Sequence, residues 1–167
     1  MLMQAVKKDE DLLSLYQAII IDHGKSPRNV GRLDSHDCSC EGKNPLCGDR
    51  VTVTAAVNDD GVVADLKFDA KGCAISIASA SMMTEAVKGL AKDDVHLISE
   101  AVRKLCKDEA AVETILENVG EALKERLEHL SALSGVRQFP TRSKCALLPW
   151  QTLLSCVDGK SAASTER

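Results

Sequence analysis

Hydrophobic and polar positions follow two different periods along this chain. Over residues 9–23, apolar side chains recur at helical spacing, and Gly24 with the polar segment 25–29 marks the end of a predicted helix. Residues 51–57 alternate instead and are rich in β-branched side chains, which predicts a strand. The change of period therefore predicts a helix followed by a sheet.

The predicted strand continues into a hairpin. Asp60-Gly61 favours a tight turn with positive φ, and residues 62–70 supply a second strand. Antiparallel pairing would bring the start of the first strand beside the end of the second. Residues 37–43 have no clear period, and we interpret them as a short edge strand.

The second half of the chain has helical periodicity. It predicts helices over 74–89, over 94–105 with Asp93 as N-cap, and over 109–133 with a break at Gly120. A last helix should begin near Cys145, because Pro149 is tolerated only in a first turn. Gly135 and the loop Phe139-Pro140 should precede this helix.

These elements predict an α+β fold in which a small antiparallel sheet packs against several helices. The 167 residues show no repeat or linker, so we expect a single domain over residues 1–160 and a disordered tail over 161–167.

Composition and charge limit the classes of function that the protein could have. The net charge is −4 and no basic run reaches five residues, which argues against nucleic acid as the main partner. No apolar stretch approaches the ~20 residues that span a bilayer, and no secretion signal is evident, so we expect a cytoplasmic protein without a membrane partner. Seven cysteines in a reducing compartment favour metal binding or catalysis over disulfides.

Three of these cysteines and one carboxylate have special surroundings. Cys47 and Asp49 flank Gly48, which lets the backbone turn so that both side chains face one point. Cys73 follows Gly72 and precedes a predicted helix, whose N-terminus favours a thiolate. Cys145 lies at the predicted start of the last helix beside Lys144 and near Arg142, and these cations should lower its pKa.

Three thiolates and one carboxylate suit tetrahedral Zn²⁺ or the edge of an iron–sulfur cluster. A purely structural zinc site usually contains only Cys and His, whereas a carboxylate oxygen exchanges more easily on a thiophilic metal. Asp49 therefore predicts a site that can open to release a thiolate. The same feature argues against a zinc domain that only docks partners.

The ordered motifs carry a family resemblance. The chain resembles the SufU/IscU/NifU N-terminal domain family of iron–sulfur cluster assembly proteins over roughly residues 12–157. The matching segments are Leu15-Tyr16, Asp22-His23, Pro27-Arg28-Asn29, the run from Asn44 to Arg50, the run from Gly72 to Met83, and the run from Arg142 to Ala146. Lys144 stands where the IscU pattern has His, and residues 93–135 are long enough for the insertion of SufU-type chains.

The resemblance implies a SufU-like, zinc-dependent sulfurtransferase. It implies that Cys47, Asp49, Cys73 and Cys145 bind Zn²⁺, and that Cys47 accepts persulfide sulfur from a SufS-type cysteine desulfurase. Arg142 would help the desulfurase to displace Cys47 from the metal, and downstream Suf scaffold proteins would receive the sulfur. The alternative is a scaffold that assembles and transfers a [2Fe–2S] cluster, or holds iron, on the same ligands.

The other four cysteines match no motif. Cys38 and Cys40 would point the same way from a strand, and we interpret them as incidental edge-strand residues. Cys106 and Cys156 lie on mostly apolar helix faces, where burial as small hydrophobic side chains is expected. His23 matches a family position without an assigned ligand role.

Overall fold

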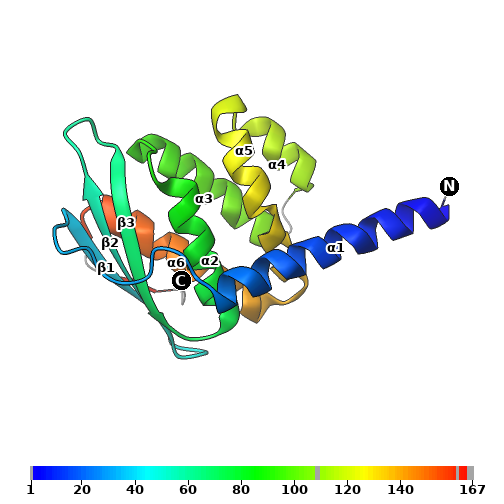
Figure 1. Cartoon of the computed structure of the whole chain (residues 1–167), viewed down its shortest axis with the longest axis horizontal. Coiled ribbons are helices and arrows are strands. Elements are labelled where there is room, and N and C mark those ends of the chain that lie inside the picture. The colour runs from blue at the N-terminus through cyan, green and yellow to red at the C-terminus, as the bar shows by residue number, and fades with distance from the viewer. Residues whose placement is uncertain (1, 108–109, 161, 165–167) are drawn as a thin grey trace.

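The computed structural model describes residues 2–107, 110–160 and 162–164 in two layers, a sheet and a group of helices that covers one of its faces (Figure 1). The strand order is β3-β2-β1-β4. The three longer strands are antiparallel neighbours: β1 (Cys38–Asn44), β2 (Asp49–Val57) and β3 (Val63–Lys71). This architecture confirms the α+β prediction.

The predicted hairpin is formed by β2 and β3. Arg50 pairs with Lys71, so the start of β2 and the end of β3 lie side by side as expected. The turn is fixed by Asn58, whose side-chain oxygen accepts hydrogen bonds from the backbone N–H groups of Asp60 and Val62, both at 3.0 Å. Gly61 has the positive φ, 77°, that the turn requires.

The ambiguous segment near residues 37–43 is the strand β1, and it is not an edge strand. The short strand β4 (Ala162–Ser164) pairs with it in parallel, with Glu41 opposite Ala162. These three residues belong to the segment 161–167 that the sequence predicts as a disordered tail, and they pair with the free side of β1. Residues 161 and 165–167 lie outside the described part of the chain.

Helices occupy most of the remaining sequence. The helical elements are α1 (Leu2–Lys25), α2 (Ala74–Val87), α3 (Lys92–Lys107), α4 (Val112–Asn118), α5 (Glu121–Leu130), the 3₁₀ element η1 (Ser131–Gln138) and α6 (Pro140–Val157). The predicted break at Gly120 is confirmed, with φ 82° before α5. Position 109, the predicted start of this region, lies outside the described residues.

Several predicted helix ends were wrong. Helix α1 begins at Leu2 and continues through Gly24, where an added Cβ would be in ordinary van der Waals contact with Ala74, so the glycine does not end the helix. Asp93 lies inside the first turn of α3, where its charge favours the helix N-terminus without capping it. Helical structure continues past Gly135 to Gln138.

Helix α2 forms the centre of the helical layer, between the sheet and the outer helices (Figure 1). It is built largely from small residues and Met, and ten of its side chains are buried. Such a helix has no wide polar face, which is typical of a helix surrounded by protein. Its N-terminus is therefore held rigidly at the end of the β2–β3 hairpin.

The last helix differs most from its prediction. It begins at Pro140, a favourable first-turn position, and it contains Pro149 in its interior. Pro149 cannot donate the hydrogen bond that the Cys145 carbonyl would otherwise accept. The neighbouring Ala146 carbonyl accepts from Ser79 Oγ at 2.5 Å, and Ser79 Oγ accepts from Trp150 Nε1 at 3.1 Å. These buried contacts with α2 stabilise the helix around the proline.

In the described part of the chain, no helix combines the length and the apolar character needed to cross a bilayer.

Candidate metal centre

Cys47 lies in the tight connection between β1 and β2. Asn44 at the end of β1 pairs with Asp49 at the start of β2, and the Gly48 N–H donates to the Asn44 carbonyl at 2.9 Å. Gly48 has φ 73°, the left-handed conformation that the sequence predicted at this point. The turn therefore leaves Cys47 exposed at the tip of a hairpin.

Asp49 has the opposite environment. Its side chain is buried, and its Oδ1 accepts the backbone N–H of Cys73 at 2.9 Å. A Cβ on Gly72 would overlap this carboxylate, so only glycine fits beside it. Asp49 was predicted as the ligand that lets the site open, but its carboxylate is anchored, whereas the thiol of Cys47 is exposed.

Cys145 comes to the site from helix α6. It is buried, and its Sγ lies 3.2 Å from Cys47 Sγ. Because α6 begins at Pro140, Cys145 is in the second turn and not at the helix start. Burial, followed by the contacts with Asp49, Cys47 and Cys73, raises the pKa of this thiol strongly. The predicted lowering by neighbouring cations is therefore wrong, because burial and acidic groups dominate.

Cys73 is the N-cap residue of α2, in agreement with its predicted place directly before this helix. Its Sγ lies 3.5 Å from Asp49 Oδ2, and that oxygen is 3.4 Å from Cys47 Sγ. The ligand atoms of Cys47, Asp49 and Cys145 all lie within 4.8 Å of one another, and Cys73 is outside this tight group. Cys73 thus contacts the group through the carboxylate of Asp49, and it also acts on the thiol of Cys145.

The donor set suits a thiophilic cation. A tetrahedral zinc with Zn–S bonds of 2.3 Å separates its sulfur ligands by about 3.8 Å. The separations of 3.2–3.5 Å among these thiols and the carboxylate are close to this spacing. Three protein elements deliver the donors: the β1–β2 turn, the start of α2 and helix α6. The described residues could therefore hold one metal ion at their junction.

Asn44 is a site residue that the sequence analysis did not single out. It is buried, and its Nδ2 donates to Cys47 Sγ at 2.8 Å and lies 3.9 Å from Cys145 Sγ. Its Oδ1 accepts the Leu46 N–H at 3.2 Å, which shapes the turn that carries Cys47. Only the motif that begins at Asn44 pointed to it, because a lone Asn has no recognisable ligand pattern.

Burial also raises the pKa of Cys47, although this residue is at the surface. The contact with Asp49 acts in the same direction, whereas the hydrogen bond with Cys145 lowers the pKa. The free thiol is therefore poorly ionised in this surrounding. A bound cation would favour the thiolate form.

Arg142 is close to Cys145 in the sequence, but its side chain does not contact the residues of the candidate metal centre. Its side chain is exposed on the first turn of α6, three residues before Cys145. It forms no ion pair with the other described residues, so its guanidinium is free to meet an external group.

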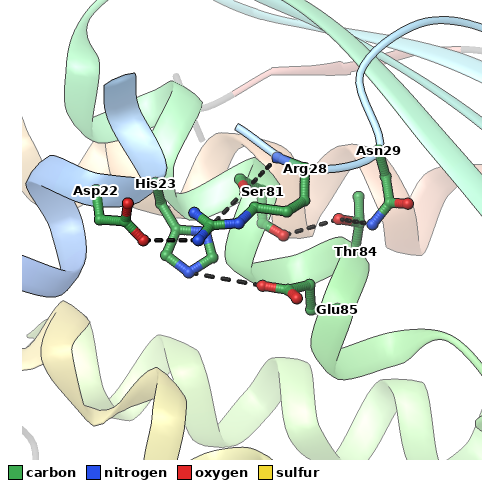
Figure 2. Close-up of polar contacts among 7 residues, drawn as sticks. All are labelled: Asp22, His23, Arg28, Asn29, Ser81, Thr84 and Glu85. Atoms are coloured by element: carbon green, nitrogen blue, oxygen red, sulfur yellow. Dashed lines mark hydrogen bonds and ion pairs between the residues drawn. The ribbon is translucent and has the colours of Figure 1, made fainter. Parts of the chain in front are cut away.

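The family motifs near residues 22–29 have a supporting role (Figure 2). His23 Nδ1 and the Arg28 N–H both lie 2.8 Å from Ser81 Oγ, which joins α1 and the following loop to α2. Asn29 donates to Thr84 Oγ1 at 2.9 Å, also on α2. This network holds the outer segment against the central helix, and His23 is not a metal ligand.

The chain is similar to two named proteins over most of its length. A protein of Bacillus subtilis named zinc-dependent sulfurtransferase SufU is 38% identical over 143 residues, which cover 86% of this chain and 89% of the relative. The iron–sulfur cluster assembly scaffold protein IscU of Thermotoga maritima is 36% identical over 139 residues, which cover 83% of this chain and 89% of that protein.

A solved structure shows the same fold. The N-terminal part of a NifU-like protein from Brucella abortus matches with a TM-score of 0.72 and 25% identity, covering 84% of this chain and 90% of that one. The family model described as the NifU-like N terminal domain matches residues 15–146. This chain therefore belongs to the NifU-like N-terminal domain family.

Proposed function

We propose that this protein carries sulfur for iron–sulfur cluster assembly, as a zinc-dependent sulfurtransferase that accepts sulfur on Cys47. The observation that carries the proposal is the contrast within the site. Cys47 is exposed at a hairpin tip, whereas Asp49 and Cys145, which touch it, are buried. Cys47 has the most exposed thiol of the proposed ligands, so it is the one best placed to leave the group and meet another protein.

Zn²⁺ would be held by Cys47, Asp49, Cys73 and Cys145. When bound, it would keep these thiols deprotonated and protect them from oxidation. The buried Asp49 and Cys145, together with Cys73, would retain the metal while the hairpin tip moves. The name of the Bacillus subtilis relative supports zinc as the cation.

The transfer step follows from thiol chemistry. The Cys47 thiolate attacks the terminal sulfur of a persulfide on a SufS-type cysteine desulfurase, and the bond between the two persulfide sulfurs breaks. The desulfurase cysteine leaves as a thiolate, and Cys47 becomes the persulfide. Asn44 Nδ2 holds Cys47 before the attack. Arg142 is exposed and lies close to Cys145 in the sequence. It would contact the desulfurase and help to displace Cys47 from the metal.

A second candidate function is a scaffold that holds a [2Fe–2S] cluster on the same residues. The observation in its favour is that a cluster is also held by thiolates, and the Thermotoga maritima relative is named a scaffold protein. Lys144, where the IscU pattern has His, favours the sulfurtransferase. In either case we place the reaction in the cytoplasm. A sulfurtransferase would pass the sulfur to downstream Suf scaffold proteins.

The experiment is a desulfurase assay with purified wild type and the variants Cys47→Ala, Asp49→Ala, Cys73→Ala and Cys145→Ala. We expect zinc-loaded wild type to accelerate sulfide release from cysteine, and Cys47→Ala to abolish this stimulation. Cys106→Ala, which removes a buried thiol in α3, is the control and should behave as wild type. Full stimulation by Cys47→Ala would disprove the role of Cys47.

The same preparations separate the two functions. A colourless protein with zinc supports the sulfurtransferase. A brown protein with iron and acid-labile sulfide after anaerobic purification would support the scaffold instead.

A further inference from the structure

A second group of thiols lies at the opposite end of β1. Cys38 and Cys40 both point toward α6, as the alternating burial of β1 shows, and Cys156 in α6 faces them. Cys38 Sγ donates to the Ala55 carbonyl at 3.8 Å, and Cys156 Sγ donates to the Val53 carbonyl at 3.9 Å. These carbonyls are two residues apart in β2, so both thiols lie over the same strand.

The close packing of β1 on α6 brings these thiols together. The two elements run in opposite directions, with Asn44 beside Cys145 at one end, and Cys38 and Cys156 over neighbouring carbonyls of β2 at the other. In the middle, a Cβ on Gly42 would overlap Thr152 Oγ1 and lie 3.2 Å from Leu148 Cδ1. The glycine thus allows the helix to approach the strand more closely than a side chain would permit.

We propose that Cys38 and Cys156 are a redox-active pair that forms a reversible disulfide and ties the start of β1 to the last turns of α6. This site is separate from the metal centre and independent of the function proposed for it. Both thiols lie over carbonyls of β2 that are two residues apart, and a disulfide requires their sulfurs to approach to about 2.05 Å.

The chemical roles of the two thiols differ. Cys38 is half-buried and can be reached from solvent, whereas Cys156 is buried. The hydrogen bond from Cys156 lowers the pKa of Cys38, and the same contact raises the pKa of Cys156. Cys38 is therefore the thiol that reacts first with the oxidant. Cys156 is the resolving thiol, which then attacks Cys38.

The oxidant is a small disulfide such as glutathione disulfide. The Cys38 thiolate attacks one of its sulfurs, forming a mixed disulfide and releasing one glutathione thiolate, which takes the Cys156 proton. Cys156 then attacks the Cys38 sulfur and releases the second glutathione. Two protein thiols are oxidised and one disulfide is reduced, so electrons and protons balance.

Cys40 supplies a matched control. It lies on the same face of β1, two residues from Cys38, and is fully buried. Burial is the main cause that raises the pKa of its thiol, so it should react slowly with an oxidant.

The test is peptide mapping of the zinc-loaded protein after exposure to glutathione disulfide and blocking of free thiols. Cleavage at Lys and Arg leaves Cys38 in peptide 33–43, and further cleavage after Trp150 separates Cys156 from Cys145. We expect peptide 33–43 linked to the fragment that contains Cys156, with fragmentation placing the bond on Cys38. Dithiothreitol should remove the link.

Variants complete the test. Cys38→Ser and Cys156→Ser should each lower the yield of the link at least about tenfold, whereas Cys40→Ser should keep it within about twofold of wild type. A link from Cys40, a link to Cys145 or Cys47, or unlinked Cys38 under conditions that oxidise Cys47 would overturn the proposal. The wild-type mapping decides the question even if a variant does not fold.

Discussion

The two ends of the β1–α6 pair both bring thiols close together, but among the described residues only the Asn44 end adds a carboxylate to the group. At the Asn44 end, the thiols of Cys47 and Cys145 meet the buried carboxylate of Asp49. At the Cys38 end, the thiols of Cys38 and Cys156 donate to backbone carbonyls. The nearby Asp37 carboxylate instead accepts the Val57 N–H at 2.7 Å.

The difference shows that clustered cysteines do not define a metal centre by themselves. The group at the Asn44 end also contains a carboxylate, and one of its thiols is exposed. Asp49, anchored by the Cys73 N–H, supplies the carboxylate, and the hairpin tip with Cys47 supplies the exposed thiol. At the Cys38 end the Asp37 carboxylate is bonded to the Val57 N–H instead, which leaves the thiols available for packing or disulfide chemistry.

Replacing one buried cysteine of α6 at each end should give the largest contrast. Cys145→Ser should weaken zinc binding by about 100-fold or more, because it removes a thiolate from the donor set. Cys156→Ser changes a cysteine of the same helix with similar burial and should retain zinc. Competition with a chromogenic chelator measures both. Equal zinc loss in the two variants would mean that helix stability, and not ligation, controls binding.

Gly42→Ala should disturb both ends together. The new Cβ would overlap Thr152 Oγ1, and we expect the free energy of unfolding to fall by about 2 kcal/mol. Urea denaturation of the zinc-loaded protein measures the change. Adding Thr152→Ala removes the overlapping oxygen and should restore part of the loss. A Gly42→Ala protein as stable as wild type would contradict the close packing of β1 on α6.

Removing the polar partner of a thiol should matter only at the metal end. Asn44→Ala deletes the hydrogen bond to Cys47 Sγ, and we expect roughly tenfold weaker zinc binding, as is typical when a residue that orients a ligand is lost. Ser155→Ala, which removes the side-chain partner of Cys40, should leave zinc affinity unchanged. Equal affinities of wild type and Asn44→Ala would exclude an orienting role for Asn44.

The smallest effect should come from His23, which lies outside both thiol groups. Burial and then Arg28 lower its pKa below the usual 6.5, so the folded protein favours the neutral ring. The unfolded chain binds the proton more readily, and stability should therefore decrease as pH falls below about 6.5. His23→Gln should flatten this part of the stability–pH curve. An unchanged slope in the variant would assign the acid sensitivity to other groups.

The sequence predicted much of the fold, and it singled out Cys47, Asp49 and Cys145, which the structure brings together. The β2–β3 hairpin followed from its period-2 pattern and the Asp60-Gly61 turn, and this hairpin correctly brought Cys73 toward Asp49. Strand β1 was difficult to recognise in the sequence. Its inward positions hold cysteines, Gly42 and Asn44, where a typical strand has large apolar residues. Its role became visible only through its packing on α6.

The start of α6 and the raised pKa of the Cys145 thiol could not be predicted, for a related reason. Pro149 is accommodated in mid-helix by buried contacts from Ser79 and Trp150, which depend on tertiary packing. The local cations Arg142 and Lys144 suggested an ionised thiol, but burial depends on the whole fold. Local sequence therefore predicted which residues form the site better than it predicted their electrostatics.

The central claim is that Cys47 leaves its buried partners to accept sulfur, and its persulfide state tests this most directly. Zinc-loaded protein is incubated with a SufS-type desulfurase and cysteine, alkylated and digested at Lys and Arg. Peptide 44–50 contains Cys47 as its single cysteine. The account predicts the added mass of one sulfur atom on this peptide in proportion to turnover. Added sulfur on another cysteine, with peptide 44–50 unmodified, would contradict it.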